Sequence, residues 1–116
     1  MTIDIEVAKN KLTGYSTVEN ADNTITAIAI HESLNNKAYC FILDVKDKIK
    51  LKVIDSAEII PCKTEEELLQ NFYRKYSEIK PDVLTGWNVN FFDIPYLYGR
   101  TVKVFDKKVA SMLSPI

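Results

Sequence analysis

The sequence predicts a single domain of the α/β class, on three observations. Residues 3–7 alternate between apolar and acidic side chains, the two-residue period of a half-buried strand. Two β-rich runs at 24–31 and 38–45 are separated by polar residues that favour a turn, which predicts an antiparallel hairpin. A capping box at 64–67, followed by an amphipathic stripe, predicts a helix that packs on the resulting sheet.

The first strand separates two kinds of side chain. Ile3, Ile5 and Val7 share one face, which we expect to be buried. Asp4 and Glu6 then share the opposite face, about 6.5 to 7 Å apart. Two such acids are either the wet side of an amphipathic strand or ligands of a Mg²⁺ or Mn²⁺ ion, which prefers carboxylate oxygen.

The rest of the chain predicts two helices and further extended structure. The run 51–60 is predicted only as extended. The stripe of the first helix consists of Leu68, Leu69, Phe72, Tyr73, Tyr76 and Ile79. Pro81 ends this helix, and residues 83–84 predict a short strand. A second helix is expected over 96–112, with Asp93 as its cap and Pro95 in its first turn.

Composition narrows the class of protein. The chain has 116 residues, of which 47% are hydrophobic and 27% charged, and its net charge is −1. It has no apolar run near the roughly 20 residues of a membrane span and no signal-like start, so we expect an intracellular protein without membrane contact. An autonomous nucleic-acid binder would carry more positive charge. Cys40 and Cys62 are expected to be reduced core thiols, since no CxxC pair accompanies them.

Two basic stretches are the exception to this charge balance. Lysines alternate over residues 46–52, and Arg100, Lys103 and Lys107 recur at helical spacing. Because most charge runs are solvated faces, we expect both stretches to be exposed.

Aromatic residues crowd around Asp93. The segment DVLTGWNVNFFDIPY places these residues close to it in sequence: Trp87, Asn88, Phe91, Phe92 and Tyr96. The rings are either core anchors or faces on which an unpaired base stacks, with Asn88 beside them. Spacing leaves both interpretations open.

Two of these stretches together resemble a known family. "DIE" at residues 4–6, followed by "TGWNVNFFDIPY" at 85–96, is similar to the first and second exonuclease motifs of family B DNA polymerases, particularly the phage type. The resemblance extends over essentially the whole chain. It implies a ribonuclease H-like mixed sheet flanked by helices, and a 3′–5′ proofreading exonuclease that cleaves DNA by two-metal-ion catalysis.

The resemblance also implies roles for individual residues. Asp4, Glu6 and Asp93 become catalytic metal ligands for two Mg²⁺ or Mn²⁺ ions, with Asp4 touching both. Asn88 and Phe92 become DNA-binding residues that hold the 3′ end. The implied partners are the single-stranded 3′ end of a primer and the rest of a polymerase chain, in the host cytoplasm if the protein is phage-encoded.

One family motif is missing. The third exonuclease motif, a Tyr followed four residues later by an Asp, has no match after residue 96. We therefore expect residues 1–116 to be a partial exonuclease domain that lacks a final strand and helix, to be inactive or nearly so in isolation, and to self-associate only through surfaces exposed by truncation. Two alternatives are a noncatalytic nucleic-acid-binding or scaffolding module of the same fold, and a protein-interaction domain whose acids are surface residues.

Overall fold

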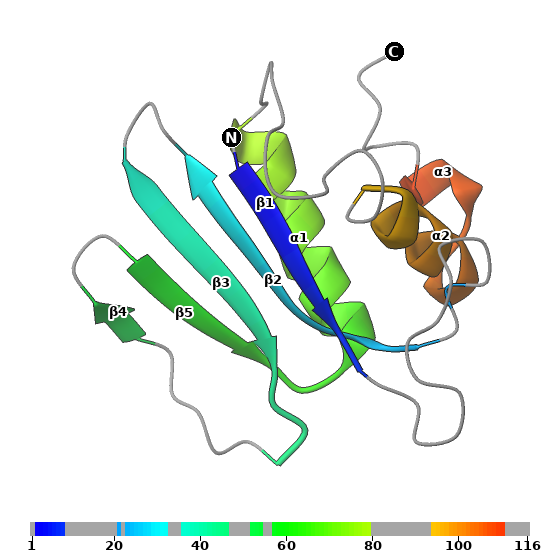
Figure 1. Cartoon of the computed structure of the whole chain (residues 1–116), viewed down its shortest axis with the longest axis horizontal. Coiled ribbons are helices and arrows are strands. Elements are labelled where there is room, and N and C mark those ends of the chain that lie inside the picture. Colours follow the sequence, from blue (N-terminus) through cyan, green and yellow to red (C-terminus); the bar gives the residue numbers. More distant parts are fainter. Residues whose placement is uncertain are drawn as a thin grey trace.

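A mixed sheet and three helices make up the described part of the chain. The computed structural model describes residues 2–8, 21, 23–32, 36–46, 52–54, 57–79 and 94–110. The strands are β1 (Thr2–Val7), β2 (Ile25–Glu32), β3 (Lys37–Leu43), β4 (Lys52–Ile54) and β5 (Ala57–Cys62). The helices are α1 (Glu65–Ile79), α2 (Ile94–Val104) and α3 (Lys107–Ala110), as Figure 1 shows. The predicted α/β class is confirmed.

The five described strands lie in the order β1-β2-β3-β5-β4. β1, β2 and β3 are successively antiparallel, which confirms the predicted hairpin. β5 is parallel to β3, and β4 is antiparallel to β5. The described residues of the run 51–60 are thus extended as predicted, and they belong to two strands. Among the described strands, β1 lies at an edge of the sheet.

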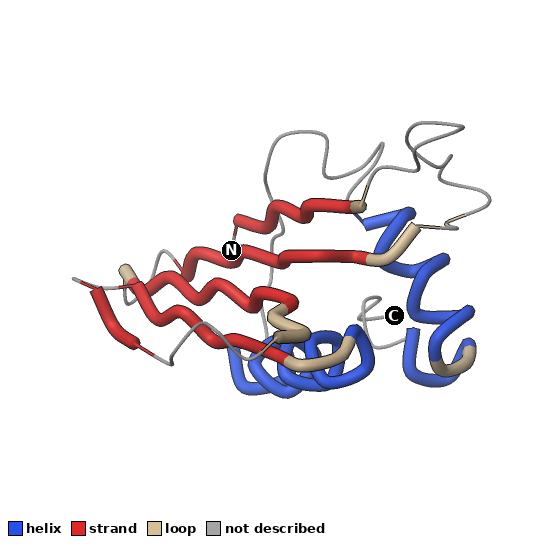
Figure 2. The backbone as a smooth tube through the Cα atoms, turned by 90° about the horizontal axis from the view of Figure 1, so that it is seen from below, coloured by secondary structure: helices blue, strands red, loops and turns tan. Residues whose placement is uncertain are grey.

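The helices occupy different places around this sheet. Figure 2, viewed along the sheet, shows α1 lying across one face, while α2 and α3 lie together beside the end of the strands. α1 contacts β2, β3 and β5, and α2 contacts α3. The sheet is therefore covered by α1 on one side.

The start of α1 has the predicted capping box. The Glu67 N–H donates to Thr64 Oγ1 at 3.1 Å, and the Glu67 carboxylate in turn accepts from the Lys63 N–H at 3.0 Å. One amide of the first helical turn, that of Glu67, and the Lys63 amide just before the cap are satisfied in this way.

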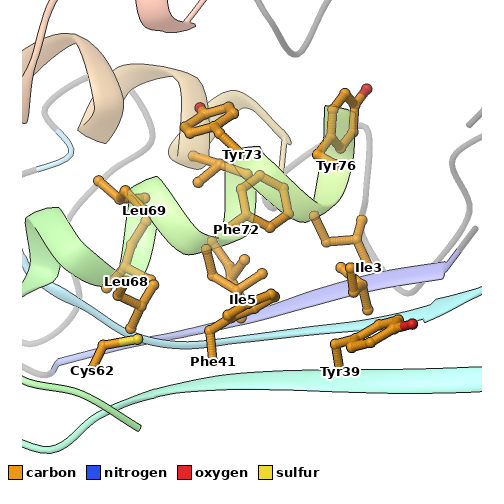
Figure 3. Close-up of a cluster of buried hydrophobic side chains, with 14 of the residues drawn as sticks. Ile3, Ile5, Tyr39, Phe41, Cys62, Leu68, Leu69, Phe72, Tyr73 and Tyr76 are labelled. Carbon is orange, nitrogen blue, oxygen red and sulfur yellow. The ribbon is translucent and has the colours of Figure 1, made fainter. Parts of the chain in front are cut away.

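The core lies between α1 and the sheet (Figure 3). Ile3 and Ile5 of β1 are buried, as predicted. From β3, Phe41 meets Phe72 of α1 edge to face, with ring centroids 6.4 Å apart. Of the predicted α1 stripe, all members are buried except Ile79, which is half-buried. The hydrophobic pattern thus predicted correctly which sides of β1 and α1 face each other.

The predicted second helix is wrong in its extent. It begins at Ile94, directly after Asp93, but α2 ends at Val104 and a new helix, α3, begins at Lys107. Asp106 causes this break, because its carboxylate accepts the Val109 N–H at 2.9 Å and so caps α3. The predicted end of this helix, Pro81 and the strand predicted at 83–84 lie outside the described residues.

The predictions for the two cysteines and for the basic stretch at residues 46–52 are confirmed only in part. Cys62 is a buried free thiol, but Cys40 is only half-buried, on the sheet face opposite α1. Burial raises the pKa of both thiols. In the described ranges, no helix is both long enough and apolar enough to cross a membrane. Lys46 is exposed as expected, and the rest of that basic stretch has no described side chain.

Candidate active site

Two of the predicted site residues lie side by side on one face of β1. Asp4 and Glu6 are both exposed, on the face turned away from α1. In the register with β2, Asp4 lies opposite Ala29 and Glu6 lies opposite Ala27. Because an alanine has only a methyl group, neither neighbour covers a carboxylate. Both acids are therefore open to solvent and to a ligand.

A recess borders the first of these acids. It has a volume of about 190 Å³ and is lined by residues that include Thr2, Asp4, Ala29, His31 and Cys40. These come from three adjacent strands, and small side chains at the centre create the recess. It has room for several water molecules or a hydrated cation. Asp4 thus lies at the edge of an open recess.

A β-bulge fixes the backbone beside the second acid. The register shifts between Glu6 and Val7, where Thr26 is an extra residue on β2. The Thr26 hydroxyl donates to the Glu6 carbonyl oxygen at 3.2 Å. The shift also explains why Ile25 and Ile28, three positions apart on one strand, are both fully buried. Sequence patterns do not reveal this role of Thr26, since a lone threonine in a β-rich run has no distinguishing signal.

The other predicted site residues fall outside the described part of the chain. These are Asp93, Asn88 and Phe92. What is described is that α2 begins at Ile94, one residue after Asp93, with Pro95 in its first turn. The helix thus begins two residues before the predicted residue 96, whereas the capping by Asp93 and its convergence with Asp4 stay predictions.

Tyr96, one of the rings near Asp93, is a core anchor. Its side chain is fully buried. Its hydroxyl donates to the Asn23 carbonyl oxygen at 2.6 Å and accepts the Asn23 N–H at 3.0 Å. Tyr96 therefore has no face available for stacking on a base, and the core interpretation holds for this ring.

Arg100 corrects the prediction of an exposed basic face on the second helix. Lys103 and Lys107 are exposed, but Arg100 is only 15% exposed and pairs with Glu65, which is 11% exposed. The pair is bidentate, with Nε to Oε2 at 2.7 Å and Nη2 to Oε1 at 2.8 Å. Sequence spacing alone does not reveal a partner 35 residues away, so periodicity assigned Arg100 to the wrong environment.

Asp4 and Glu6 are the predicted metal ligands that the described part of the chain contains. Within those ranges no three His, Cys, Asp or Glu side chains gather closely enough to hold a metal ion. Asp4 and Glu6 supply two carboxylates on one open face, and hard divalent cations favour such oxygen ligands. A complete site needs at least one more ligand from elsewhere in the chain.

The sequence of this chain, which carries the open acidic face of β1, matches a known protein family. The profile of "DNA polymerase family B, exonuclease domain" matches residues 1–113. The chain belongs to this family. Its matched region includes both acids of β1 and the whole segment around Asp93, so the resemblance stated from the two motifs is confirmed.

Several relatives of this exonuclease domain are DNA polymerases. The DNA-directed DNA polymerase of Escherichia phage RB69 is 31% identical over 97% of the chain, and that of Enterobacteria phage T4 is 25% identical over 97%. The DNA polymerase delta catalytic subunit of Dictyostelium discoideum is 34% identical over 86%. The matches cover 14%, 15% and 9% of these relatives, respectively. The chain thus spans about a seventh of the phage polymerases.

Proposed function

We propose that the chain forms part of the 3′–5′ exonuclease of a DNA-directed DNA polymerase and contributes to hydrolysis of the terminal phosphodiester bond at a DNA 3′ end. The single observation that carries this proposal is the placement of Asp4 and Glu6 together on the open face of β1, within a chain of the exonuclease family. An antiparallel β1-β2-β3 unit followed by a helix across one face also supports a ribonuclease H-like fold. The substrate would be the single-stranded 3′ end of a primer, presented by the remainder of the polymerase inside the cell.

The residues present fit a pair of Mg²⁺ or Mn²⁺ ions. Asp4 and Glu6 provide hard oxygen ligands on an exposed face, and the methyl groups of Ala27 and Ala29 leave space above them. We propose that Asp93 supplies the third carboxylate, from the position just before α2. When bound, two such ions activate a water molecule and stabilise the departing oxygen during phosphodiester hydrolysis.

The negative charge on this face affects how the chain binds DNA when no metal ion is bound. Two carboxylates on β1, in a chain of net charge −1, repel the phosphates of DNA. Asp4 and Glu6 therefore favour binding of the 3′ end only after divalent cations neutralise them. Asn88 and Phe92 are proposed to hold the terminal nucleotide, with the ring of Phe92 stacked on a base. A mismatched terminus would enter this site more often because it unpairs at lower cost.

The test is degradation of single-stranded DNA by the full-length protein that carries this chain, measured while Mn²⁺ is titrated. We expect release of deoxynucleoside monophosphates from the 3′ end, and loss of that activity in an Asp4→Ala/Glu6→Ala variant. The matched control is Glu66→Gln, which removes an exposed carboxylate on α1, away from β1. Equal degradation by the parent and the double variant would contradict the proposal.

The same titration tests the noncatalytic alternative. A nucleic-acid-binding or scaffolding module would bind single-stranded DNA equally well with Mn²⁺ and with a chelator, and would release no nucleotide. The exonuclease proposal requires the opposite result for both measurements, because the bare acids of β1 repel phosphate.

A further inference from the structure

α2 is tied to the segment that leads into β2 by two buried side chains. Tyr96 bonds both backbone groups of Asn23, as described above. One turn later on the same helix, the Arg100 guanidinium donates to the Ala21 carbonyl oxygen at 3.2 Å and to Thr24 Oγ1 at 3.5 Å. Together they hold one side of α2 against residues 21–24.

Glu65 extends this connection to β1. Besides the bidentate pair with Arg100, Glu65 Oε2 accepts the Ile25 N–H at 2.8 Å. Ile25 pairs with Val7 across the β1-β2 ladder, and the Ala8 N–H donates to the Thr24 carbonyl oxygen at 2.9 Å. A continuous series of hydrogen bonds thus runs from α2, through the first residue of α1, to the end of β1.

The two ends of this series lie close in sequence to the proposed metal ligands. On β1 it ends at Val7, the residue after Glu6. On α2 it begins at Arg100 and Tyr96, and this helix starts at Ile94, the residue after Asp93. The series therefore sets where the start of α2 lies relative to the strand that carries the acids.

Packing alone gives no reason for an ion pair here. Leu97 and Thr101 of α2 are already fully buried. A buried ion pair is often replaceable by apolar residues without loss of stability, since the desolvation of both charges offsets their attraction. A bidentate guanidinium does fix direction and distance, however, and metal ligands must be held to within about 0.5 Å of their productive positions.

From these contacts we propose that Arg100, through Glu65, is a positioning residue for the exonuclease reaction. It orients the start of α2 at Ile94, the residue after Asp93 in the sequence, relative to the strand that carries Asp4 and Glu6. This inference rests on the proposed function above, because it gives the pair a role only if those three carboxylates act together.

The experiment uses the full-length protein with two variants and a control. In Arg100→Met/Glu65→Gln the fork is lost, but methionine fills the space and the glutamine oxygen can still accept the Ile25 N–H. In Arg100→Lys the charge remains and the planar fork is lost. The control is Lys107→Met, the loss of an exposed positive charge at the start of the neighbouring helix α3. Thermal melting, kcat and KM on single-stranded DNA, and the Mn²⁺ concentration for half-maximal rate are measured for each.

For a positioning role we expect the double variant to melt within a few degrees of the parent, with kcat at least tenfold lower, KM within threefold, and a raised Mn²⁺ requirement. Lys107→Met should match the parent in melting temperature, kcat, KM and Mn²⁺ requirement. A folded double variant with parental kcat and Mn²⁺ requirement would overturn the inference.

Folding defects are separated from positioning by the second variant. If the double variant is unfolded at the assay temperature, the Arg100→Lys variant tests the inference instead. A tenfold loss in its kcat with an unchanged melting temperature supports a positioning role. A parental kcat overturns it. Unfolding of both variants also overturns it, because the pair then serves the fold alone. Failure of the proposed function is recognised separately, since the parent itself would then show no activity sensitive to Asp4→Ala/Glu6→Ala.

Discussion

The two faces of β1 carry opposite kinds of side chain for opposite reasons. Toward α1, Ile3 and Ile5 are buried against aromatic rings, and their removal would leave a cavity. On the other face, Asp4 and Glu6 are exposed beside alanines. One face therefore stabilises the fold, while the other places two like charges where they repel each other. We therefore expect the acids to be dispensable for folding, and we propose that their placement serves the binding of ions.

The largest expected effect is on the acidic face. Asp4→Asn removes one proposed ligand charge and should lower the exonuclease rate of the full-length protein by about a thousandfold, as loss of one preorganised electrostatic group does. The free energy of unfolding should change by no more than about 0.5 kcal/mol, and in the stabilising direction, because repulsion with Glu6 is relieved. Nucleotide release and urea unfolding of the same sample check both statements.

Substitutions in the core that the apolar face of β1 packs against should lower stability and leave the exonuclease rate unchanged. Phe72→Ala removes the ring that meets Phe41 and should lower the free energy of unfolding by about 3 to 5 kcal/mol. The rate per folded molecule should stay at the parental value. Phe72→Leu, which keeps most of the apolar volume, serves as the control and should lose clearly less. If Phe72→Ala left stability unchanged, the packing of α1 on the sheet would need revision.

Alkaline pH tests a buried contact between α1 and α2. Thr101 donates its only hydroxyl hydrogen to the Leu97 carbonyl oxygen at 2.7 Å, so the Tyr73 hydroxyl donates to Thr101 Oγ1, also at 2.7 Å. Burial raises the pKa of Tyr73 to about 12.

An unfolded tyrosine ionises near pH 10. The neutral phenol of Tyr73 therefore contributes stability that is fully present below pH 10 and is lost as the pH rises through 12, approaching about 2 kcal/mol. Urea unfolding between pH 9 and 12 should show this decline in the parent and a shallower one in Tyr73→Phe. Parallel declines in the two proteins would mean that Tyr73 ionises equally in both states.

The smallest expected effect is the stabilisation by metal. At a Mn²⁺ concentration ten times the dissociation constant, binding to the folded state should add about 1.4 kcal/mol and raise the melting temperature by a few degrees. This increment should persist in Phe72→Ala and vanish in Asp4→Asn, since Asp4 is a proposed ligand and Phe72 belongs to the core. An increment that survives in Asp4→Asn would place the ion elsewhere.

Sequence patterns predicted those parts of the molecule that depend on local periodicity. The two-residue alternation of β1 separated Asp4 and Glu6 from the core, and the capping box at Thr64 located the start of α1. The break after Val104 was missed because apolar spacing continues past it, although Asp106 carries a capping signal.

Contacts between distant segments could not be predicted in this way. Arg100 has the spacing of an exposed basic face, and its burial depends on Glu65 and on Ala21, 35 and 79 residues away. Thr26 likewise acquires its role from a register shift between two strands. Within the described residues, the local pattern predicted the exposed placement of Asp4 and Glu6 on β1, whereas the contacts of Arg100 and Thr26 became apparent only from the tertiary structure.

The most direct test of the central claim is anomalous scattering from Mn²⁺ in crystals of the full-length protein. Manganese should lie within coordination distance of the Asp4 and Glu6 carboxylates, with Asp93 contributing to the same centre directly or through water. Manganese bound only at other carboxylates, or Asp93 located on the α1 side of the sheet, would contradict the account.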